Sequence, residues 1–472
     1  MKDGSSFGQL LAGLRTELSR YSEGEKLPSS RVLVRQYQVS PVTVSRAIAV
    51  LAAEGLVTSR PGAGVFKASA RRDRGALGDV SWQEVALSAD AGARGADAAS
   101  VLATLTTPPP EVIDLNGGYL HASLQPERAL AAALARAGRR PGAWSRPPVE
   151  GLTELRAWFA RDVGGPAGPL GVPDVLVTAG GQTALTTALR ALAVPGAPVL
   201  VESPTYPGLL SVARAAGLRP VPVPVDADGV RTDLLAEAFA ASRARVFVCQ
   251  PLFSNPSGTV LSPTRRTEVL TIAREAGAFV VEDDFARRLV HADSPPLPRP
   301  LAADDPDGVV VHVRSLTKAA SPSLRIGALT ARGPALERLR AIQVVDSLFV
   351  PRPLQEVALE LVGSPAWASH LRTLAAALRD RRTALVDALA ELRPDRTPRG
   401  GYHLWIRLPD GTDERAVAAT ALRAGVAVTP GGPYFAAEAP APYLRLSYVS
   451  TPGTAQLEEG AGRLRVALRP YG

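Results

Sequence analysis

The apolar residues near the start of the chain recur every three or four positions. In a helix this spacing places them on one side, so it predicts an amphipathic helix over about residues 7–18. The residues of this apolar face are Phe7, Leu10, Leu11, Leu14 and Leu18.

Two more short helices are predicted before residue 55. Ser29 or Ser30 follows a proline and suits the N-cap of a second helix, which runs to about Tyr37. Ser40 and Pro41 have the residue types preferred at the N-cap and the first position of a third helix. The N-terminal part of this region is therefore expected to be helical.

The third helix has an apolar side and a polar side. Its apolar side is predicted to carry Val44, Ile48 and Leu51, which leaves Thr43 and Arg46 pointing outward near its N-terminal end. The following stretch, "LVTSRPGAGVF", predicts two short strands around a Pro-Gly-Ala-Gly turn. Three short helices and such a hairpin make a winged helix-turn-helix, whose third helix presents its first turns to the major groove of DNA.

Beyond residue 150, short apolar runs alternate with helical stretches. Continuous apolar runs of this length are typical of strands covered on both faces, so the pattern predicts an α/β fold with a mostly parallel sheet between helices. The runs are "DVLVT" at 174–178, "PVLVES" at 198–203, "RVFVCQ" at 245–250, "AFVVEDD" at 278–284 and "GVVVHVRS" at 308–315.

Composition separates the two patterned regions. Residues 68–110 are rich in Ala, Gly, Asp and Arg and end in "TTPPP", so they are expected to form a linker with one helical segment at "VSWQEVAL". This divides the chain into a winged helix-turn-helix at 1–67, the linker at 68–110 and a third region at 111–472. Within the third region we expect a large domain at about 150–345 and an α+β small domain at about 350–472.

Functional side chains in such a sheet are expected beyond the carboxyl ends of the strands, where ligands bind. Gly181 and Gln182 open a helix after one strand, and backbone N–H groups at a helix start suit a phosphate. Tyr206, Asn255 and Asp283 follow three other strands. Taken singly, each has a structural interpretation as well, namely a tight turn, core packing or a turn-forming amide.

The carboxylates at 282–284 raise the question of a metal. No histidine lies near them in the sequence at the usual ligand spacing, and no second acidic cluster accompanies them. The sequence therefore predicts no metal site.

The choice between lysine and arginine singles out one residue more clearly than the strand ends do. Of the 53 lysines and arginines four are lysine, which leaves 49 arginines (53 − 4), and Lys318 is the only lysine after residue 67. A lysine can lose its proton and attack a carbonyl group, whereas an arginine stays charged in proteins. Ser315 precedes Lys318 by three residues and Arg325 follows it by seven. A phosphate cradle, an aromatic ring, an amide, a carboxylate and this lysine together match an aromatic aldehyde phosphate, pyridoxal 5′-phosphate.

The charge and cysteine content agree with this interpretation. A formal net charge of +8 permits contact with nucleic acid, and the single cysteine, Cys249, excludes an intrachain disulfide. The sequence shows neither a signal peptide nor an apolar run of about 18 residues, so we expect no membrane segment. We expect a cytoplasmic protein.

The stretch "GEKLPSSRVLVRQYQVSPVTVSRAIAVLAAEGLV" with "RPGAGVF" resembles the GntR family of bacterial repressors over residues 7–67. The resemblance implies contacts with double-stranded operator DNA. The implied contact residues are Arg31, Thr43 and Arg46, together with the wing glycines Gly62 and Gly64. The alternative is a module for protein contact, in which Arg46 is a solvated charge.

Residues 112–472 resemble fold type I pyridoxal-phosphate enzymes of the aspartate aminotransferase class, and the whole chain resembles a MocR-type regulator. The resemblance implies that Lys318 forms an imine with the cofactor, Asp283 pairs with the ring nitrogen, Asn255 bonds the ring hydroxyl and Tyr206 stacks on the ring. It also implies that Arg445 in "PYLRLSY" binds an amino acid's α-carboxylate, for which a surface ion pair is the alternative. The residues implied at the phosphate are Gly181, Gln182, Ser315 and Arg325.

Two residues depart from that family's pattern. Phe285 stands where members commonly have a tyrosine that helps to hold the ring oxygen, which puts catalysis more in doubt than cofactor binding. Trp144 stands where members often have a tyrosine that reaches the partner subunit's cofactor. Fold type I sites lie at a dimer interface, so the resemblance implies a homodimer.

Two functions remain from the sequence. The first is a transcriptional regulator that senses pyridoxal phosphate, an amino acid or both through its aminotransferase-like domain. The second is a catalytically active aminotransferase that carries an accessory DNA-binding head. The intact GntR-like head favours the first, and Phe285 points the same way, with at most weak or half-reaction transaminase activity.

Overall fold

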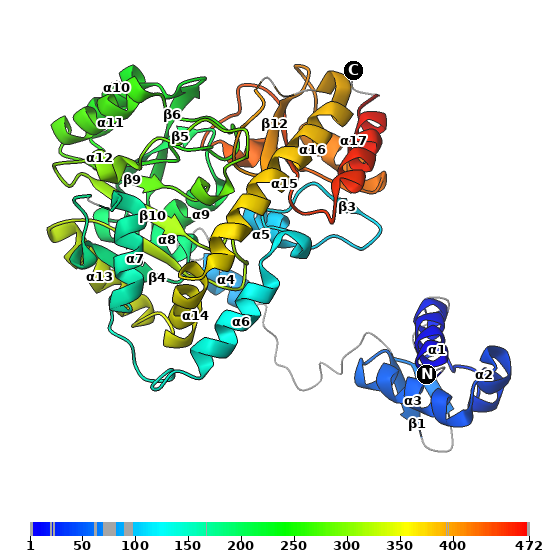
Figure 1. Ribbon diagram of the computed structural model, residues 1–472. Coiled ribbons are helices and arrows are strands. Elements are labelled where there is room, and N and C mark those ends of the chain that lie inside the picture. Colours follow the sequence, from blue (N-terminus) through cyan, green and yellow to red (C-terminus); the bar gives the residue numbers. More distant parts are fainter. Residues whose placement is uncertain are drawn as a thin grey trace. The chain divides into compact units, whose positions relative to one another are not determined.

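A computed structural model describes most of the chain, namely residues 3–18, 21, 24–60, 64–68, 82–88, 98–166, 168–392, 394 and 396–469. The chain divides into two compact units, Met1–Arg94 and Gly95–Gly472, each with its own core (Figure 1). We call the described residues of the first unit between 3 and 68 the head. No helix in the described ranges has the length and hydrophobicity needed to cross a bilayer.

The head consists of three helices and a hairpin, as the sequence predicts. Its core is formed by buried side chains from every helix and from the hairpin: Leu10, Leu14, Leu18, Leu27, Leu33, Val44, Ala47, Leu51 and Val57. Its elements are α1 (Asp3–Leu18), α2 (Ser30–Tyr37), α3 (Pro41–Ala53), β1 (Val57–Arg60) and β2 (Gly64–Lys67).

The start of α3 shows why this helix begins where it does. The Ser40 side chain accepts a hydrogen bond from the Thr43 N–H at 3.1 Å, and Pro41 occupies the first turn. Proline lacks an N–H, so it leaves no unsatisfied donor at a position where the helix itself supplies no acceptor. β1 and β2 pair antiparallel from Val57↔Lys67 to Arg60↔Gly64, which confirms the wing.

Two helices fall within the predicted linker. The first, α4 (Trp82–Ser88), confirms the helical segment expected at "VSWQEVAL". The second, α5 (Ala99–Leu105), is not predicted and belongs to the larger unit. It packs against α9 (Pro207–Ala215), and the carbonyl oxygen of Ala103 accepts a hydrogen bond from Asn116 Nδ2 at 2.7 Å. Part of the predicted linker is therefore folded onto the aminotransferase-like domain.

The larger unit is built on an eight-stranded sheet with the order β4-β11-β10-β9-β8-β5-β6-β7. The five predicted strands are all present, and β5, β6, β8, β9 and β10 run parallel to one another, whereas β11 and β7 run antiparallel to their neighbours. The strands are β4 (Val175–Thr178), β5 (Pro198–Ser203), β6 (Arg219–Asp226), β7 (Gly229–Val230), β8 (Val246–Cys249), β9 (Phe279–Asp283), β10 (Val310–Ser315) and β11 (Gly327–Thr330).

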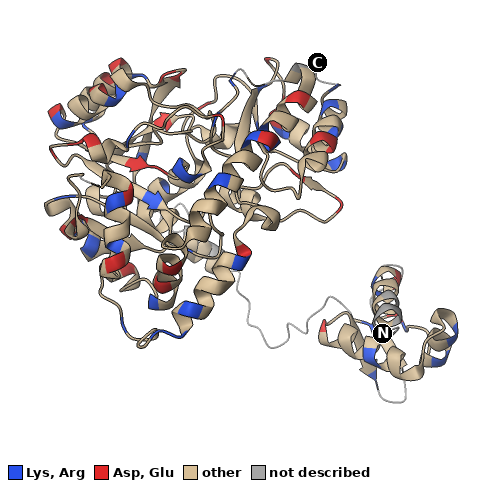
Figure 2. Ribbon diagram, viewed as in Figure 1, with Lys and Arg blue, Asp and Glu red and all other residues tan. Residues whose placement is uncertain are grey.

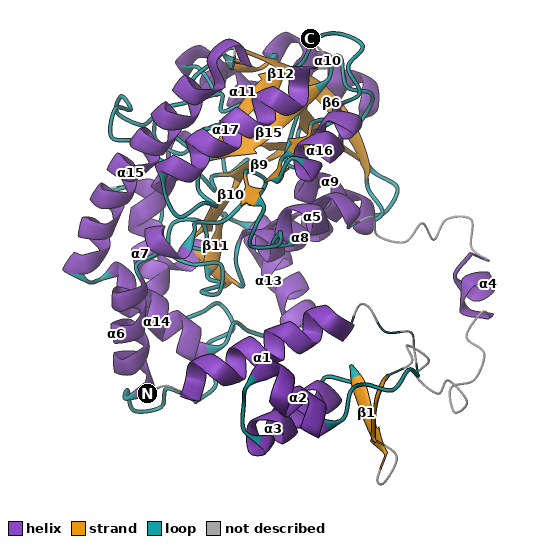
Figure 3. Cartoon of the chain, turned by 90° about the vertical axis from the view of Figure 1, so that its right-hand side faces the viewer, coloured by secondary structure: helices purple, strands orange, loops and turns teal. Residues whose placement is uncertain are grey.

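Helices cover both faces of this sheet (Figure 3). Successive strand residues face opposite layers, so on β9 Val281 packs in one core with α8, α9 and α13, while Val280 packs in another with α10, α11 and α12. The covering helices are α7 (Thr153–Gly164), α8 (Gly181–Leu192), α10 (Thr232–Ser242), α11 (Pro263–Glu275), α12 (Leu301–Asp304) and α13 (Pro334–Ser347).

The C-terminal part is a smaller α+β layer around the sheet β12-β15-β14. β3 (Ile113–Asp114) pairs parallel with β13 of this part, so the segment just after α5 is a strand of the C-terminal region. The remaining elements are α6 (Glu127–Gly138), α14 (Arg352–Val362), α15 (Pro365–Leu389), β12 (His403–Arg407), α16 (Glu414–Arg423), β13 (Val426–Ala427), β14 (Thr429–Pro430), β15 (Tyr443–Ser447) and α17 (Thr454–Leu468), with 3₁₀ turns at Ala122–Leu124, Val172–Asp174, Arg287–Leu289, Ala390–Leu392 and Gly432–Tyr434.

Basic and acidic residues are interspersed along the outer helices of the larger unit (Figure 2). Several form ion pairs there, such as Arg265 with Asp226 at 2.5 Å and Arg274 with Asp307 at 3.2 Å. Exposed pairs of this kind contribute little stability. They match positive charge with negative charge, so the net charge of the chain does not mark this surface as a nucleic-acid contact.

Candidate functional site

The residues predicted for the cofactor and for an amino acid come together in one cavity of about 470 Å³. This volume lies within the usual range for small-molecule sites. The predicted residues that line it are Gly181, Gln182, Tyr206, Asn255, Asp283, Ser315, Lys318, Arg325 and Arg445.

One end of the cavity is suited to an anion. Gly181 and Gln182 form the first turn of α8, whose backbone N–H groups carry the positive end of the helix dipole. Gly180, the N-cap, has a φ of +90°, and a Cβ there would lie 3.0 Å from Arg325 Nη2. Glycine therefore lets the guanidinium group approach the helix start, where Arg325 also donates to the Ala179 carbonyl at 3.1 Å. Ser315 ends β10 beside this turn.

The middle of the cavity is suited to a flat ring. Tyr206 precedes α9, and its hydroxyl donates to Gln182 Oε1 at 3.3 Å. Asn255 is buried, and its side-chain oxygen has no hydrogen-bond partner among the described residues. An unpaired buried amide is costly unless a ligand satisfies it, so this atom points to a bound polar group.

Asp283 lies at the end of β9 and is fixed by Gln250. Gln250 Nε2 donates to Asp283 Oδ2 at 2.7 Å, and its side-chain oxygen accepts the Asn255 N–H at 2.9 Å. Burial raises the pKa of Asp283 to about 6, while the hydrogen bond from Gln250 lowers it. Gln250 therefore connects the predicted partner of the ring nitrogen with the predicted partner of the ring hydroxyl.

Lys318 is half-buried in the wall of the cavity and is an amine of reduced basicity. Its Nζ donates to the Gly118 carbonyl at 2.7 Å and lies 4.0 Å from the centre of the Tyr119 ring. Burial and the nearby positive charges of Arg445 and Arg325 lower its pKa to about 8, partly offset by Tyr119 and Asp283. A larger fraction of the amine is then neutral near pH 7, as a nucleophile requires.

Arg445 lies on β15 and is almost fully buried. Its Nη2 donates to the Asn116 carbonyl, and its guanidinium group lies 5.8 and 5.7 Å from the rings of Tyr402 and Tyr434. Its Nε has no hydrogen-bond partner among the described residues. The alternative of a surface ion pair is therefore wrong, because the side chain is buried and faces the cavity.

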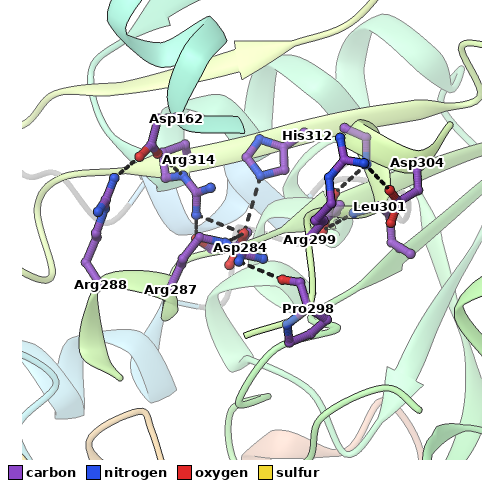
Figure 4. A network of polar contacts seen from close by, with 12 residues as sticks. Asp162, Asp284, Arg287, Arg288, Pro298, Arg299, Leu301, Asp304, His312 and Arg314 are labelled. Carbon is purple, nitrogen blue, oxygen red and sulfur yellow. Dashed lines mark hydrogen bonds and ion pairs between the residues drawn. The ribbon is translucent and has the colours of Figure 1, made fainter. Parts of the chain in front are cut away.

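A buried ionic network supports the strand ends behind the cavity (Figure 4). Asp284 pairs with Arg287 at 2.5 Å and with Arg314 at 2.8 Å, and Arg314 also pairs with Asp162 at 2.9 Å. Burial would raise the pKa of Asp284, but the charges of Arg314 and Arg287 hold it below its usual value. Arg314 directly precedes Ser315, and Asp284 directly follows Asp283. The buried network therefore helps to fix the backbone of these two cavity residues.

This network also bears on the metal question. Glu282, Asp284 and His312 lie close enough together to resemble a metal cluster, which their sequence spacing does not suggest. Glu282 accepts the N–H groups of Leu301 and Ala302 at 2.8 and 3.1 Å, and Asp284 is held by the two arginines. Two guanidinium groups beside the carboxylate disfavour a cation, so the cluster is better suited to a structural role.

The two departures from the family pattern have different surroundings. Phe285 lines the cavity and packs edge to face with Tyr402 at 6.2 Å. Trp144 is 85% exposed in the larger unit and does not line the cavity.

Several cavity residues were not predicted. Gln250 directly follows β8, so the rule that located Asn255 and Asp283 could have found it. Others come from α5, from the segment after β3 and from the C-terminal part, for which no strand-end signal exists. Among them are Val101, Thr104, Leu105, Tyr119, Tyr402 and Tyr434.

In the head, Arg31 and Arg46 are exposed, and the Arg46 guanidinium lies 4.8 Å from the centre of the Phe7 ring. Thr43 is half-buried, and its hydroxyl lies 2.8 Å from that of Ser40. Gly64 has a φ of +116°, which favours glycine. The predicted contact at Gly62 lies outside the described residues.

Comparisons with known proteins agree with both units. The family "Aminotransferase class I and II" matches residues 110–464, and the family "Bacterial regulatory proteins, gntR family" matches residues 9–66. The 2-aminoadipate transaminase of Thermus thermophilus is 32% identical over 398 residues, covering 83% of this chain and 98% of that protein. The HTH-type transcriptional regulator TauR of Rhodobacter capsulatus is 27% identical over 474 residues, covering 95% and 93%.

A solved structure shows the same relation. The α-aminoadipate aminotransferase LysN of T. thermophilus, complexed with N-(5′-phosphopyridoxyl)-L-leucine, has a TM-score of 0.74 at 30% identity and covers 83% of this chain and 99% of its own. Pyridoxal 5′-phosphate is the cofactor of this fold, and the unpaired Asn255 oxygen and the anion-binding end of the cavity fit it. The chain belongs to the aminotransferase class I and II family, and the gntR-type head fused to it makes it a DNA-binding transcriptional regulator of the MocR type.

Proposed function

We propose that this regulator holds pyridoxal phosphate in the cavity and senses an amino acid there, changing its affinity for operator DNA in response. One observation carries the proposal: the side chains predicted for the cofactor and for a carboxylate converge in one cavity of a chain that also has a folded gntR-type head. Alternatively, the signal that changes operator affinity is binding of pyridoxal phosphate itself.

In this proposal each side of the cavity has one role. Gly181, Gln182, Ser315 and Arg325 hold the phosphate, and Tyr206, Asn255 and Asp283 hold the ring. When bound, the cofactor supplies an aldehyde carbon that amines attack and a ring that withdraws electrons. Lys318 supplies the protein's amine, and a free amino acid competes with it while its carboxylate binds Arg445. The carboxylate can accept two N–H groups from one guanidinium, a strong and directional contact.

The head is proposed to bind DNA through Arg31, Thr43 and Arg46 and through the wing at Gly62 and Gly64. Phosphate contacts from arginines and backbone N–H groups position such a domain, while side chains at the start of the third helix read base edges. Arg46 suits this role because it is exposed in the first half of α3.

The proposal extends to assembly and location. We expect a homodimer, as the resemblance to fold type I enzymes implies, and the exposed Trp144 is a residue that a second copy could cover. We expect the dimer to act in the cytoplasm, at the nucleoid. The proposed functional boundaries stay at 1–67, 68–110 and 111–472, with α5 as the folded end of the linker.

A second candidate is an active aminotransferase that carries the head as an accessory. The lowered pKa of Lys318 and the placement of Asp283 favour it, since both are needed for turnover. Phe285 opposes it, because a phenylalanine offers no hydroxyl to the ring oxygen. We therefore expect at most weak or half-reaction transamination.

The test uses the full-length, cofactor-loaded protein and a DNA fragment selected by footprinting upstream of the neighbouring gene. Amino-acid affinity is measured with and without this DNA, in the wild type, in Arg445→Ala and in the control Arg423→Ala, which changes an exposed arginine of the same region. We expect a coupling of about 1–3 kcal/mol in the wild type and in the control, and none in Arg445→Ala. Unchanged affinity for every amino acid, together with sustained amino transfer to a keto acid, would establish the second candidate instead.

A further inference from the structure

A second buried carboxyl group, that of Glu202, lies near the carboxyl end of β5. Glu202 is 4% exposed, and its Oε2 accepts a hydrogen bond from the main-chain N–H of Gln250 at 2.8 Å. The side chain of the same Gln250 donates to Asp283. Glu202 does not line the cavity, so the proposed function places it in no contact with a ligand. Its contact with Gln250 nevertheless connects it to the cofactor site.

The order of the strands explains why these three residues lie together. β8 lies between β5 and β9, and all three strands run parallel, so their carboxyl ends meet at one edge of the sheet. The register aligns Val201, Val248 and Val281 across the three strands. The residues that follow these positions therefore lie at the same edge, with Gln250 between the two acidic side chains.

Gln250 connects Glu202 with both predicted ring contacts. Its Nε2 donates to Asp283 Oδ2 at 2.7 Å, and its Oε1 accepts the N–H of Asn255 at 2.9 Å. A long amide side chain loses rotamer freedom when it makes both bonds, so its main chain must be well held. Glu202 supplies an acceptor for that main-chain N–H at a position where β8 has already ended.

Glu202 is buried without a basic partner. The ion pairs formed by the described residues include none to its carboxyl group, whereas the similarly buried Glu356 pairs with Arg140 and Arg352. Burial raises the pKa of Glu202 to about 7, the N–H of Gln250 opposes this shift, and the charge of Asp283 adds to it. The neutral carboxyl group is therefore accessible near pH 7, and a glutamine should serve equally well as the acceptor.

We propose that Glu202 is a positioning residue of the cofactor site, which acts by fixing the main chain of Gln250. Gln250 then holds Asp283, the proposed partner of the ring nitrogen, and Asn255, the proposed partner of the ring hydroxyl. The inference rests on the cofactor binding of the proposed function, and it is independent of whether the protein senses an amino acid.

Single substitutions test the contact in the full-length protein. The apoprotein of each variant is titrated with pyridoxal phosphate, and the absorbance of the bound cofactor gives the affinity. Glu202→Leu removes the acceptor and should weaken the affinity about tenfold, the scale for one buried hydrogen bond. Glu202→Gln keeps an acceptor of the same length and should stay within about twofold of the wild type. Glu356→Leu, a control that changes a buried glutamate outside the cavity, should also stay within about twofold.

A double variant tests whether Glu202 acts through Gln250. Once Gln250→Leu has removed the two side-chain bonds, adding Glu202→Leu should change the cofactor affinity by no more than about twofold. A merely structural role of Glu202 would not depend on the side chain of Gln250. Losses of affinity that multiply in the double variant would therefore overturn the proposal.

Glu202→Asp keeps the test decisive if Glu202→Leu does not fold. It retains the carboxyl group but withdraws it by one methylene group, so it should also weaken the affinity about tenfold, and only while Gln250 is present. Full affinity in Glu202→Asp, or a tenfold loss in Glu202→Gln, would overturn the role of Glu202 alone. If the wild type binds no pyridoxal phosphate, the cofactor binding of the proposed function fails, and this proposal fails with it.

Discussion

The head and the cavity of the larger unit use their functional residues in opposite ways. In the head, Arg31 and Arg46 are exposed on two different helices, α2 and α3, so their contributions to binding should be nearly additive. In the cavity, Asp283 is buried and Lys318 is half-buried, and both interact with other site residues. Loss of one contact there should disturb several. The contrast predicts that substitutions in the head act independently, whereas one substitution in the cavity affects several contacts.

The largest expected effect tests the cavity. Lys318→Ala should abolish covalent capture of the cofactor, because no other amine of the larger unit's sequence can replace it. Borohydride reduction and peptide mapping should tag Lys318 in the wild type. Lys26→Ala, a change in the head, should capture cofactor normally. Covalent capture that persists in Lys318→Ala would contradict the assignment.

The rate of cofactor capture should depend on pH in a way set by Lys318. With a pKa of about 8 instead of 10.5, roughly 300-fold more of the amine is neutral at pH 7. The rate should therefore rise nearly tenfold from pH 6 to 7, about fivefold from pH 7 to 8, and level off above about pH 9. Stopped-flow absorbance of the apoprotein mixed with cofactor measures it. A rise that continues to pH 10 would mean an unperturbed lysine.

Loss of the buried ionic network should lower the stability of the larger unit and leave that of the head unchanged. Arg314→Leu leaves Asp284 and Asp162 buried without their shared partner and should destabilise the larger unit by about 3–5 kcal/mol, with the head unaffected. Arg190→Leu breaks a half-exposed pair with Asp346 and should cost about 1 kcal/mol or less. Denaturant unfolding, monitored separately for each unit, tests both. Equal losses of stability in Arg314→Leu and Arg190→Leu would contradict the special role of the buried network.

Gln250 should matter to cofactor binding more than to folding. Gln250→Leu removes the hydrogen bonds to Asp283 and Asn255 and should weaken cofactor affinity by about 1.5–3 kcal/mol, the scale for a bond to a charged group. Gln355→Leu is a matched control, since Gln355 is equally buried but bonds Leu152 and Val350 outside the cavity. A similar loss of affinity in both variants would indicate general damage.

The smallest expected effect tests additivity in the head. Arg46→Ala should weaken operator binding by about 1–3 kcal/mol and leave the cofactor's absorbance unchanged. Arg31→Ala should act independently, so that the double variant equals the sum of the single ones within about 0.5 kcal/mol. Fluorescence anisotropy with labelled DNA at constant salt measures all three. If the loss of binding free energy in the double variant differed strongly from the sum of the two single losses, the head residues would be coupled, as the cavity residues are expected to be.

Local patterns predict the head almost completely. Ser40 and Pro41 mark the start of α3, and the apolar spacing of residues 7–18 gives α1, because each depends on neighbours within about one or two turns. In the larger unit the same rules miss β6 and β11. β6 reads "RPVPVPVD", and its alternating prolines argue against a strand. β11 is a four-residue stretch, "GALT", without a distinguishing pattern.

The site residues also divide into those that local sequence patterns predict and those that they do not. Residues at the ends of parallel strands meet at one edge of the sheet, so sequence alone identifies Asn255, Asp283 and Ser315 as neighbours. The wall from α5 and the ring of Tyr402 come from other parts of the fold. Their positions depend on the pairing of β3 with β13 and on the docking of the C-terminal sheet, which no local rule predicts.

The solitary lysine gives the larger unit an unusual chemical simplicity. Its sequence offers a single side-chain amine, in the cavity, whereas all other positive charges of that unit are arginines. A lysine-specific endoprotease can therefore cut this unit after one residue, and an amine-directed tag can attach to it at one side chain. Anything that blocks Nζ removes both reactions together. Mass spectrometry of protein taken from cells can therefore show whether Lys318 is free or modified, by whether the unit is cut or tagged at this residue.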